Sequence, residues 1–138
     1  MIPIRRNQRG AAAIEFALIL PVLVLLILGI IEFSVALYDK AVITNASREG
    51  ARAGIVFRDP PVTDGEIVGV VTSYCQNRMI TFGSPGQVTT TVLREGMASG
   101  DDLTVRVQYG YQFLAVPKFV VALAGGIQLG GQTIMRME

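Results

Sequence analysis

The sequence predicts an α+β fold in which a long N-terminal apolar helix packs on a small antiparallel sheet with one additional helix. Three observations support this prediction. Residues 11–37 are almost wholly apolar. Residues 64–78 repeat apolar side chains at helical spacing, and residues 103–109 alternate apolar and polar side chains as a half-buried strand does. The chain of 138 residues has the length of one such domain.

Composition and charge argue against several classes of function. The chain has no His and a single Cys, Cys75, so it lacks the commonest catalytic base and metal ligand and forms no internal disulfide. Neither the phosphate-binding loop pattern nor the nucleophile-elbow pattern occurs. Twelve basic and eleven acidic residues leave a net charge of +1, which attracts no polyanion. We therefore expect no enzymatic activity, no cofactor, no metal and no nucleic-acid partner.

The chain divides into three parts. Residues 1–10 form a short basic leader, residues 11–57 form the long helix, and residues 58–138 form the outer α+β domain. Three interpretations of the apolar run remain open: a cleaved secretory signal, a permanent membrane anchor, or a helix that sits first in a membrane and then in a protein bundle.

Two acids interrupt the apolar run. Glu15 lies inside it, where an ionised side chain costs at least about 2.5 kcal/mol by insertion scales, so it is a functional candidate unless it snorkels to the interface. Glu32 is expected to mark the outer interface. The leader is purely basic, whereas Asp39 and Lys40 cancel beyond the run. The positive-inside rule then places the N-terminus in the cytoplasm and the outer domain across the inner membrane, with a single span.

The residues around the leader resemble a known signal. Gly10 precedes the run Ala-Ala-Ala-Ile-Glu-Phe of residues 11–16, which is similar to the type III signal of prepilins. Together with Pro21 and the run Arg-Glu-Gly-Ala-Arg of residues 48–52, the segment 9–52 resembles the TadE-like minor pilins, or pseudopilins, of tight-adherence (Tad/Flp) pilus systems.

This resemblance implies a fate for the chain. A prepilin peptidase would cut between Gly10 and Ala11, and Glu15 and Phe16 would act in processing and assembly. The fold would be pilin-like. The partners would be other pilin and pseudopilin subunits, the inner-membrane assembly platform and membrane lipid, in a pilus that serves adherence or secretion.

The chemistry of the segment is compatible with this fate. Glu15 lies one helical turn from Ala11, so its carboxylate can neutralise a newly formed terminal amine of its own or a neighbouring chain. Pro21 removes one backbone donor, which predicts a kink or a loosened turn, although proline is also common in ordinary membrane helices.

A stripe of small residues continues the helix beyond the apolar run. It comprises Ala46, Gly50, Ala53 and Gly54. Arg48 and Arg52 lie one turn apart in the same stretch. Two interpretations remain open: a packing stripe with a solvated charged face, or a contact surface between subunits.

The outer domain has clear local signals. Thr63 and Glu66 have the spacing of a capping box, which predicts a helix over residues 64–78 with Cys75 on its buried face. Strands are predicted over residues 87–94, 103–109 and 127–136, the last with a bulge at Gly130-Gly131. Residues 113–123 are expected to form either a short helix that caps the sheet edge or a contact surface.

The leading functional hypothesis is therefore a minor pilin or pseudopilin. The alternative is a single-span protein whose outer domain binds a ligand or the cell wall. The position of N-terminal cleavage discriminates between them, because the first loses ten residues and the second loses none.

Overall fold

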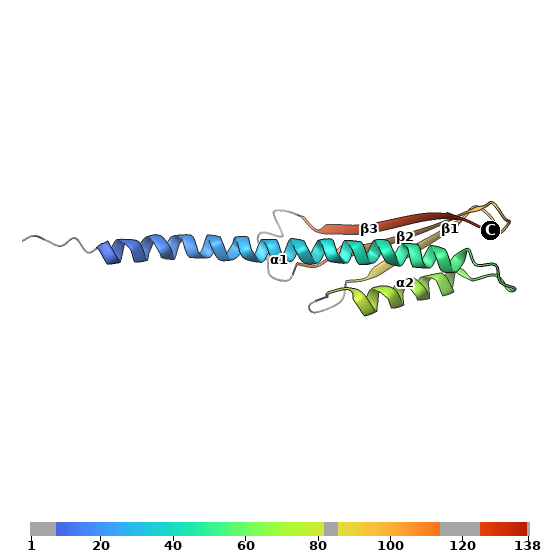
Figure 1. Cartoon of the computed structure of the whole chain (residues 1–138), viewed down its shortest axis with the longest axis horizontal. Coiled ribbons are helices and arrows are strands. Elements are labelled where there is room, and N and C mark those ends of the chain that lie inside the picture. Colours follow the sequence, from blue (N-terminus) through green and yellow to red (C-terminus); the bar gives the residue numbers. More distant parts are fainter. Residues whose placement is uncertain (1–7, 82–85, 114–124, 138) are drawn as a thin grey trace, which may run out of the picture.

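The computed structural model describes residues 8–81, 86–113 and 125–137 and confirms the predicted α+β fold. A single long helix runs the length of the molecule, and the other elements gather around its C-terminal half (Figure 1). The described elements are α1 (Gln8–Gly54), α2 (Asp64–Arg78), β1 (Val88–Arg94), β2 (Asp102–Tyr111) and β3 (Ile127–Arg136). The segment 113–123, for which a capping helix or a contact surface was expected, lies almost wholly outside the described residues.

Helix α1 has 47 residues and is therefore about 70 Å long. It continues through Pro21 as one helix, and its ribbon runs without a sharp bend (Figure 1). It ends at Gly54, before the expected limit of residue 57, and its last backbone bond joins the Ile55 N–H to the Ala51 carbonyl. The Asp59-Pro60-Pro61 run that follows is incompatible with further helix.

Helix α2 begins at the predicted capping box. The Thr63 hydroxyl accepts from the Glu66 N–H, and the Glu66 carboxylate accepts from the Thr63 N–H. The helix ends where the Met79 N–H bonds to the Cys75 carbonyl. Because its N-terminal signal is local and complete, the predicted range of 64–78 agrees with the structure.

The three strands form an antiparallel sheet with the order β1-β2-β3. The predicted bulge at Gly130-Gly131 is wrong, because β2 and β3 pair one-to-one along their whole length. At Gly131 the structure gives a different reason for glycine. A Cβ on Gly131 would lie 2.9 Å from Thr44 Cα and 3.1 Å from the Ile43 carbonyl oxygen, so glycine permits the close approach of β3 to α1.

The core lies where α1, α2 and the inner face of the sheet meet. Its fully buried members are Ile43, Ala46 and Ala51 of α1, Ile67 and Val71 of α2, and Leu103, Val105 and Val107 of β2. No described residue before Glu32 belongs to this core. The outer domain is therefore built on the C-terminal half of α1 and leaves the N-terminal half free.

Candidate functional site

The N-terminal half of α1 is exposed on every side. All residues from Gly10 to Ile27 are exposed, including Phe16 at 62% and Leu18 at 70%. Its most apolar window has a mean hydropathy of 2.9. By length and composition this helix is capable of crossing a membrane, and the hydrophobic effect provides a strong reason for so much apolar surface to leave water.

The residues predicted for processing lie at the start of this exposed half. Gly10 and Ala11 are already helical, within the first turn of α1. Glu15 and Phe16 follow one turn later, and both are exposed. A peptidase that binds an extended substrate would therefore have to unwind this first turn, which glycine at position 10 makes easier.

Glu32 is the first buried residue of α1, with only 4% of its surface exposed. The Tyr111 hydroxyl donates to its Oε1 at 2.9 Å. Burial and the neighbouring Glu32 carboxylate raise the pKa of Tyr111, so the phenol stays protonated and remains a donor. Glu32 therefore links α1 to β2 where the outer domain begins, and its position at a membrane interface stays a prediction.

Asp39, two turns further along α1, is fully buried. It was not identified from the sequence as a candidate site residue. Its Oδ1 accepts from the Ile80 N–H at 2.9 Å, which anchors the segment after α2 to α1. Its Oδ2 has no hydrogen-bond partner among the described residues. Burial raises the pKa of this carboxyl group above its ordinary value. The sequence did contain a signal for this position: Asp39 lies seven residues after Glu32, which places both acids on the same face of the helix.

The small-residue stripe faces the interior of its own subunit. A Cβ on Gly50 would lie 2.5 Å from Val71 Cγ2, and one on Gly54 would lie 2.5 Å from Leu103 Cδ2. Ala46 is fully buried, and Ala53 is half-buried. Of the two interpretations of this stripe, a packing surface or a contact between subunits, packing within the subunit agrees with these neighbours.

Arg48 and Arg52 lie on the opposite, exposed face of α1. Within the described part of the chain, one side-chain hydrogen bond involves this pair, and it joins Arg48 Nη1 to Asn45 Oδ1 at 3.5 Å. Their guanidinium groups are therefore available to solvent or to a neighbouring molecule, and they add little to the stability of the fold.

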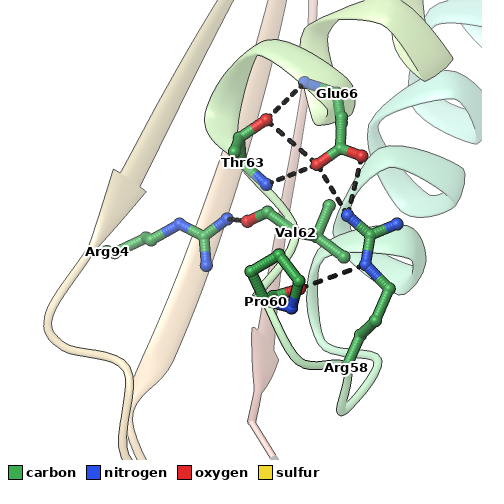
Figure 2. Close-up of polar contacts among 6 residues, drawn as sticks. All are labelled: Arg58, Pro60, Val62, Thr63, Glu66 and Arg94. Carbon is green, nitrogen blue, oxygen red and sulfur yellow. Dashed lines mark hydrogen bonds and ion pairs between the residues drawn. The ribbon is translucent and has the colours of Figure 1, made fainter.

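A cluster of polar contacts joins the segment between α1 and α2 to the first turn of α2 and to Arg94 of β1 (Figure 2). Arg58 Nη2 donates to both carboxylate oxygens of Glu66, at 2.7 and 2.9 Å, and its Nε donates to the Pro60 carbonyl at 3.2 Å. These contacts and the capping box hold the pKa of Glu66 down to about 2. From the sheet, Arg94 donates to the Val62 carbonyl and pairs with Asp64, each at 2.7 Å.

Nothing in the described parts of the chain resembles a catalytic centre. A pocket of about 650 Å³ lies between α2 and the start of β1, and its lining includes Cys75, Met79, Val88 and Tyr109. Cys75 is buried as predicted, and burial raises the pKa of its thiol to about 11, so it is not a reactive thiolate. Within residues 8–81, 86–113 and 125–137, no three His, Cys, Asp or Glu side chains gather to hold a metal ion.

Comparison with known proteins gives one match. Residues 10–52 match the model of a family described as TadE-like protein. No curated protein and no solved structure matches the chain. The matched range begins at the predicted cleavage position and ends near the C-terminus of α1, so it covers both halves of the helix and none of residues 58–138. The chain therefore carries a TadE-like segment, which confirms the resemblance that its sequence indicated.

Proposed function

We propose that this protein is a minor pilin, or pseudopilin, of a tight-adherence pilus or secretion system. A prepilin peptidase removes residues 1–10, and the exposed half of α1 holds the mature subunit in the inner membrane until it joins an assembly. The N-terminus lies in the cytoplasm and the outer domain in the periplasm before assembly. Other pilin and pseudopilin subunits and the assembly platform are its partners, and the assembled structure serves adherence or surface attachment.

The observation that carries this proposal is the division of α1 into an exposed apolar half and a half that bears a domain. A lipid anchor alone accounts for the first half. The exposed apolar surface continues past the point where the domain begins, however, through Phe33, Leu37 and Tyr38. Since the described part of the outer domain covers only one face of α1, its other face is available to pack against helices of other subunits. This arrangement favours an assembly subunit over an isolated membrane anchor.

N-terminal sequencing of the mature protein tests the proposal. We expect the mature chain to begin at Ala11, and Gly10→Leu to block the cut because a large side chain replaces glycine in the peptidase cleft. A chain that keeps residues 1–10 would favour the alternative, a single-span protein with a ligand-binding or wall-binding outer domain. A mature chain that begins after residue 30 would indicate a cleaved secretory signal and contradict both.

Cysteine labelling tests the proposed orientation. Cys75 is 1% exposed, so it reacts only once the domain is mildly unfolded. We expect a membrane-impermeant thiol reagent to label it in cells whose outer membrane has been opened, provided that mild denaturant is present. Labelling that requires lysis of the inner membrane would place the domain in the cytoplasm and refute this topology.

A further inference from the structure

The two edges of the sheet have complementary features that the proposed function does not use. β1 and β3 are the edge strands, and β2 lies between them. Each edge strand presents a row of backbone N–H and C=O groups that β2 does not bond. Rows of this kind are suited to bind a further strand.

The hydrogen-bond pattern of the sheet identifies the backbone groups of β1 and β3 that do not bond to β2. The Glu95 N–H bonds to the Asp102 carbonyl, so alternate residues of β1 from Glu95 backwards bond to β2, while Val88, Thr90, Val92 and Arg94 point their backbone groups outward. On the other edge the Met137 N–H bonds to the Asp101 carbonyl. By the same alternation, the backbone N–H and C=O groups that point away from β2 on this edge are those of Gly130, Gln132, Ile134 and Arg136. The Gly130 carbonyl agrees with this assignment, since it accepts from Lys40 Nζ instead of from β2.

The residues of the two edge strands lie in register across the sheet. Val88 pairs with Tyr109, which pairs with Leu129, and Arg94 pairs with Leu103, which pairs with Met135. Two antiparallel steps also make β1 and β3 parallel to each other. Copies of the chain anchored side by side in one membrane share a direction and a height, which rests on the proposed function. Such copies present β1 of one subunit to β3 of the next.

We propose that neighbouring copies of this chain join laterally, with β1 of one copy pairing in parallel with β3 of the next copy. At equal height, Thr90 of one copy faces Gly131 of the other. The Thr90 N–H then donates to the Gly130 carbonyl, whose oxygen has two lone pairs and accepts this bond beside the one from Lys40 Nζ. The Thr90 carbonyl accepts from the Gln132 N–H, which completes the hydrogen-bond pattern of a parallel pair. Because the two surfaces differ, the contact repeats from copy to copy and builds an open row instead of a closed dimer.

The side chains support this pairing. Neither edge carries a charge over residues 88–93 or 127–135. On the outer face, Leu93 and Ile134 are 52% and 57% exposed within one subunit, and pairing brings them side by side. At the next level, the exposed Glu95 lies opposite Arg136, which pairs through Nε with Asp102 of its own subunit at 3.3 Å and whose side chain is 73% exposed, so its other guanidinium nitrogens are open to a second carboxylate. An antiparallel β1–β1 dimer would instead point the two α1 helices in opposite directions, which one membrane does not allow.

Disulfide trapping in membranes that contain the full-length chain tests the proposal. Thr91 and Gln132 lie on the outer face, about 10 Å apart within one subunit and about 5 Å apart across the proposed contact, taking a strand spacing near 4.8 Å. A disulfide needs Cα atoms within about 7 Å, so only the intermolecular bond forms. We expect the double variant Thr91→Cys/Gln132→Cys to yield a ladder of dimers, trimers and larger species on oxidation.

A matched control displaces one cysteine along the same strand. Gln128 lies on the same face as Gln132 but about 13 Å away along β3, at about 3.3 Å per residue. The variant Thr91→Cys/Gln128→Cys should give no ladder. Equal cross-linking in both double variants, no cross-linking in either, or a dimer with Thr91→Cys alone would overturn the parallel β1–β3 contact.

A charge swap supplies a second test. In the Thr91→Cys/Gln132→Cys background, Leu93→Lys should abolish most of the ladder because it places a charge on an uncharged edge. Adding Ile134→Glu should restore it, since the two charges meet only across the contact. Protection of Cys75 from thiol reagents checks that each variant is folded. A ladder unaffected by Leu93→Lys, or not restored by the second change, would refute the contact.

These results are separable from the test of the proposed function. An uncleaved chain that forms the ladder would retain the lateral contact and reject pilin processing. A chain cleaved at Gly10 without a ladder would retain the processing and reject the contact.

Discussion

The two halves of α1 belong to one continuous helix but differ in what surrounds them. Residues 10–31 are apolar except for Glu15 and none of them is buried, whereas residues 32–54 bury one face against α2 and the sheet. A membrane, which the first half is apolar and long enough to cross, would require only that its side chains be apolar. In the second half, packing also sets the size of each side chain, which is why Gly50 and Gly54 sit where α2 and β2 come closest. The difference shows that apolar composition is enough to suit a helix surface to an apolar surrounding. Packing against a particular protein surface also requires side chains of matching size and shape.

Glu15→Gln should have the largest effect, and it should act on assembly and leave the fold intact. If Glu15 neutralises a terminal amine inside an apolar bundle, the variant leaves that amine unpaired at a cost of about 3–5 kcal/mol. Association with partner pilins should then fall by two or more orders of magnitude, at about 1.4 kcal/mol per tenfold. Co-purification with the other pilus subunits measures this loss.

Glu49→Gln is the matched control, because Glu49 is an exposed acid in the packed half of α1. It should co-purify at the wild-type level. Wild-type assembly and normal cleavage of Glu15→Gln would show that Glu15 merely snorkels to the interface.

Ile67→Ala should destabilise the outer domain by about 2–5 kcal/mol, because Ile67 is fully buried between α1 and the sheet and its truncation leaves a cavity. Leu23→Ala removes a comparable side chain from the exposed half of α1, where Leu23 is 48% exposed. It should not change the free energy of unfolding of the outer domain. Denaturant unfolding of the detergent-solubilised chain compares the two. Similar losses in both variants would mean that the halves of α1 are not energetically separate.

Gly50→Val should cost about 1–3 kcal/mol, because the added atoms meet Val71, Ile67 and Val105 on three sides. A Cβ added to Gly29 would meet no neighbouring atom within 4 Å, so Gly29→Val should leave the outer domain as stable as the wild type. Thermal unfolding midpoints measure both. An unchanged midpoint for Gly50→Val would show that α2 shifts to make room and that glycine is not required there.

The smallest expected effects on stability come from the ionisation of two carboxyl groups, Glu66 and Asp39, whose contributions depend on pH in opposite directions. The pKa of Glu66 is lowered from 4.5 to about 2, so its ionised form stabilises the fold above pH 4.5, and this contribution is lost as the pH falls towards 2. The pKa of Asp39 is raised above 3.8, so the folded state binds its proton more tightly. Its contribution is complete below pH 3.8 and is lost as the pH rises through its folded-state pKa.

Unfolding midpoints across pH should separate these two contributions. Glu66→Gln should remove part of the loss of stability in acid, and Asp39→Asn should remove part of the loss that accompanies rising pH. Asp39→Asn keeps an oxygen for the Ile80 N–H, so the fold should persist. A pH profile of Asp39→Asn that coincides with that of the wild type would contradict a raised pKa in the folded state.

The sequence by itself determined the features that depend on residues a few positions apart. The boundaries of α2 follow from Thr63 and Glu66, which bond to each other across one turn. β2 follows from strict alternation, although the structure extends it from the predicted 103–109 to Asp102–Tyr111 because both ends still find partners on β3. The resemblance of the N-terminal segment to TadE-like proteins could also be recognised from the sequence, because it depends on a local pattern of residues. The family match over residues 10–52 confirms it.

Only the tertiary structure decided which surfaces meet. The sequence indicated a small-residue stripe on α1 but not that α2 and β2 of the same subunit would cover it. It suggested a bulge at Gly130-Gly131, whereas Gly131 instead admits the backbone of α1. It did not reveal that Glu32 meets Tyr111 or that Asp39 holds the Ile80 amide, because these partners lie 79 and 41 positions apart. Local hydrogen bonds and periodicity determine each element separately, but the contacts between distant elements depend on how their shapes fit, which no short stretch of sequence encodes.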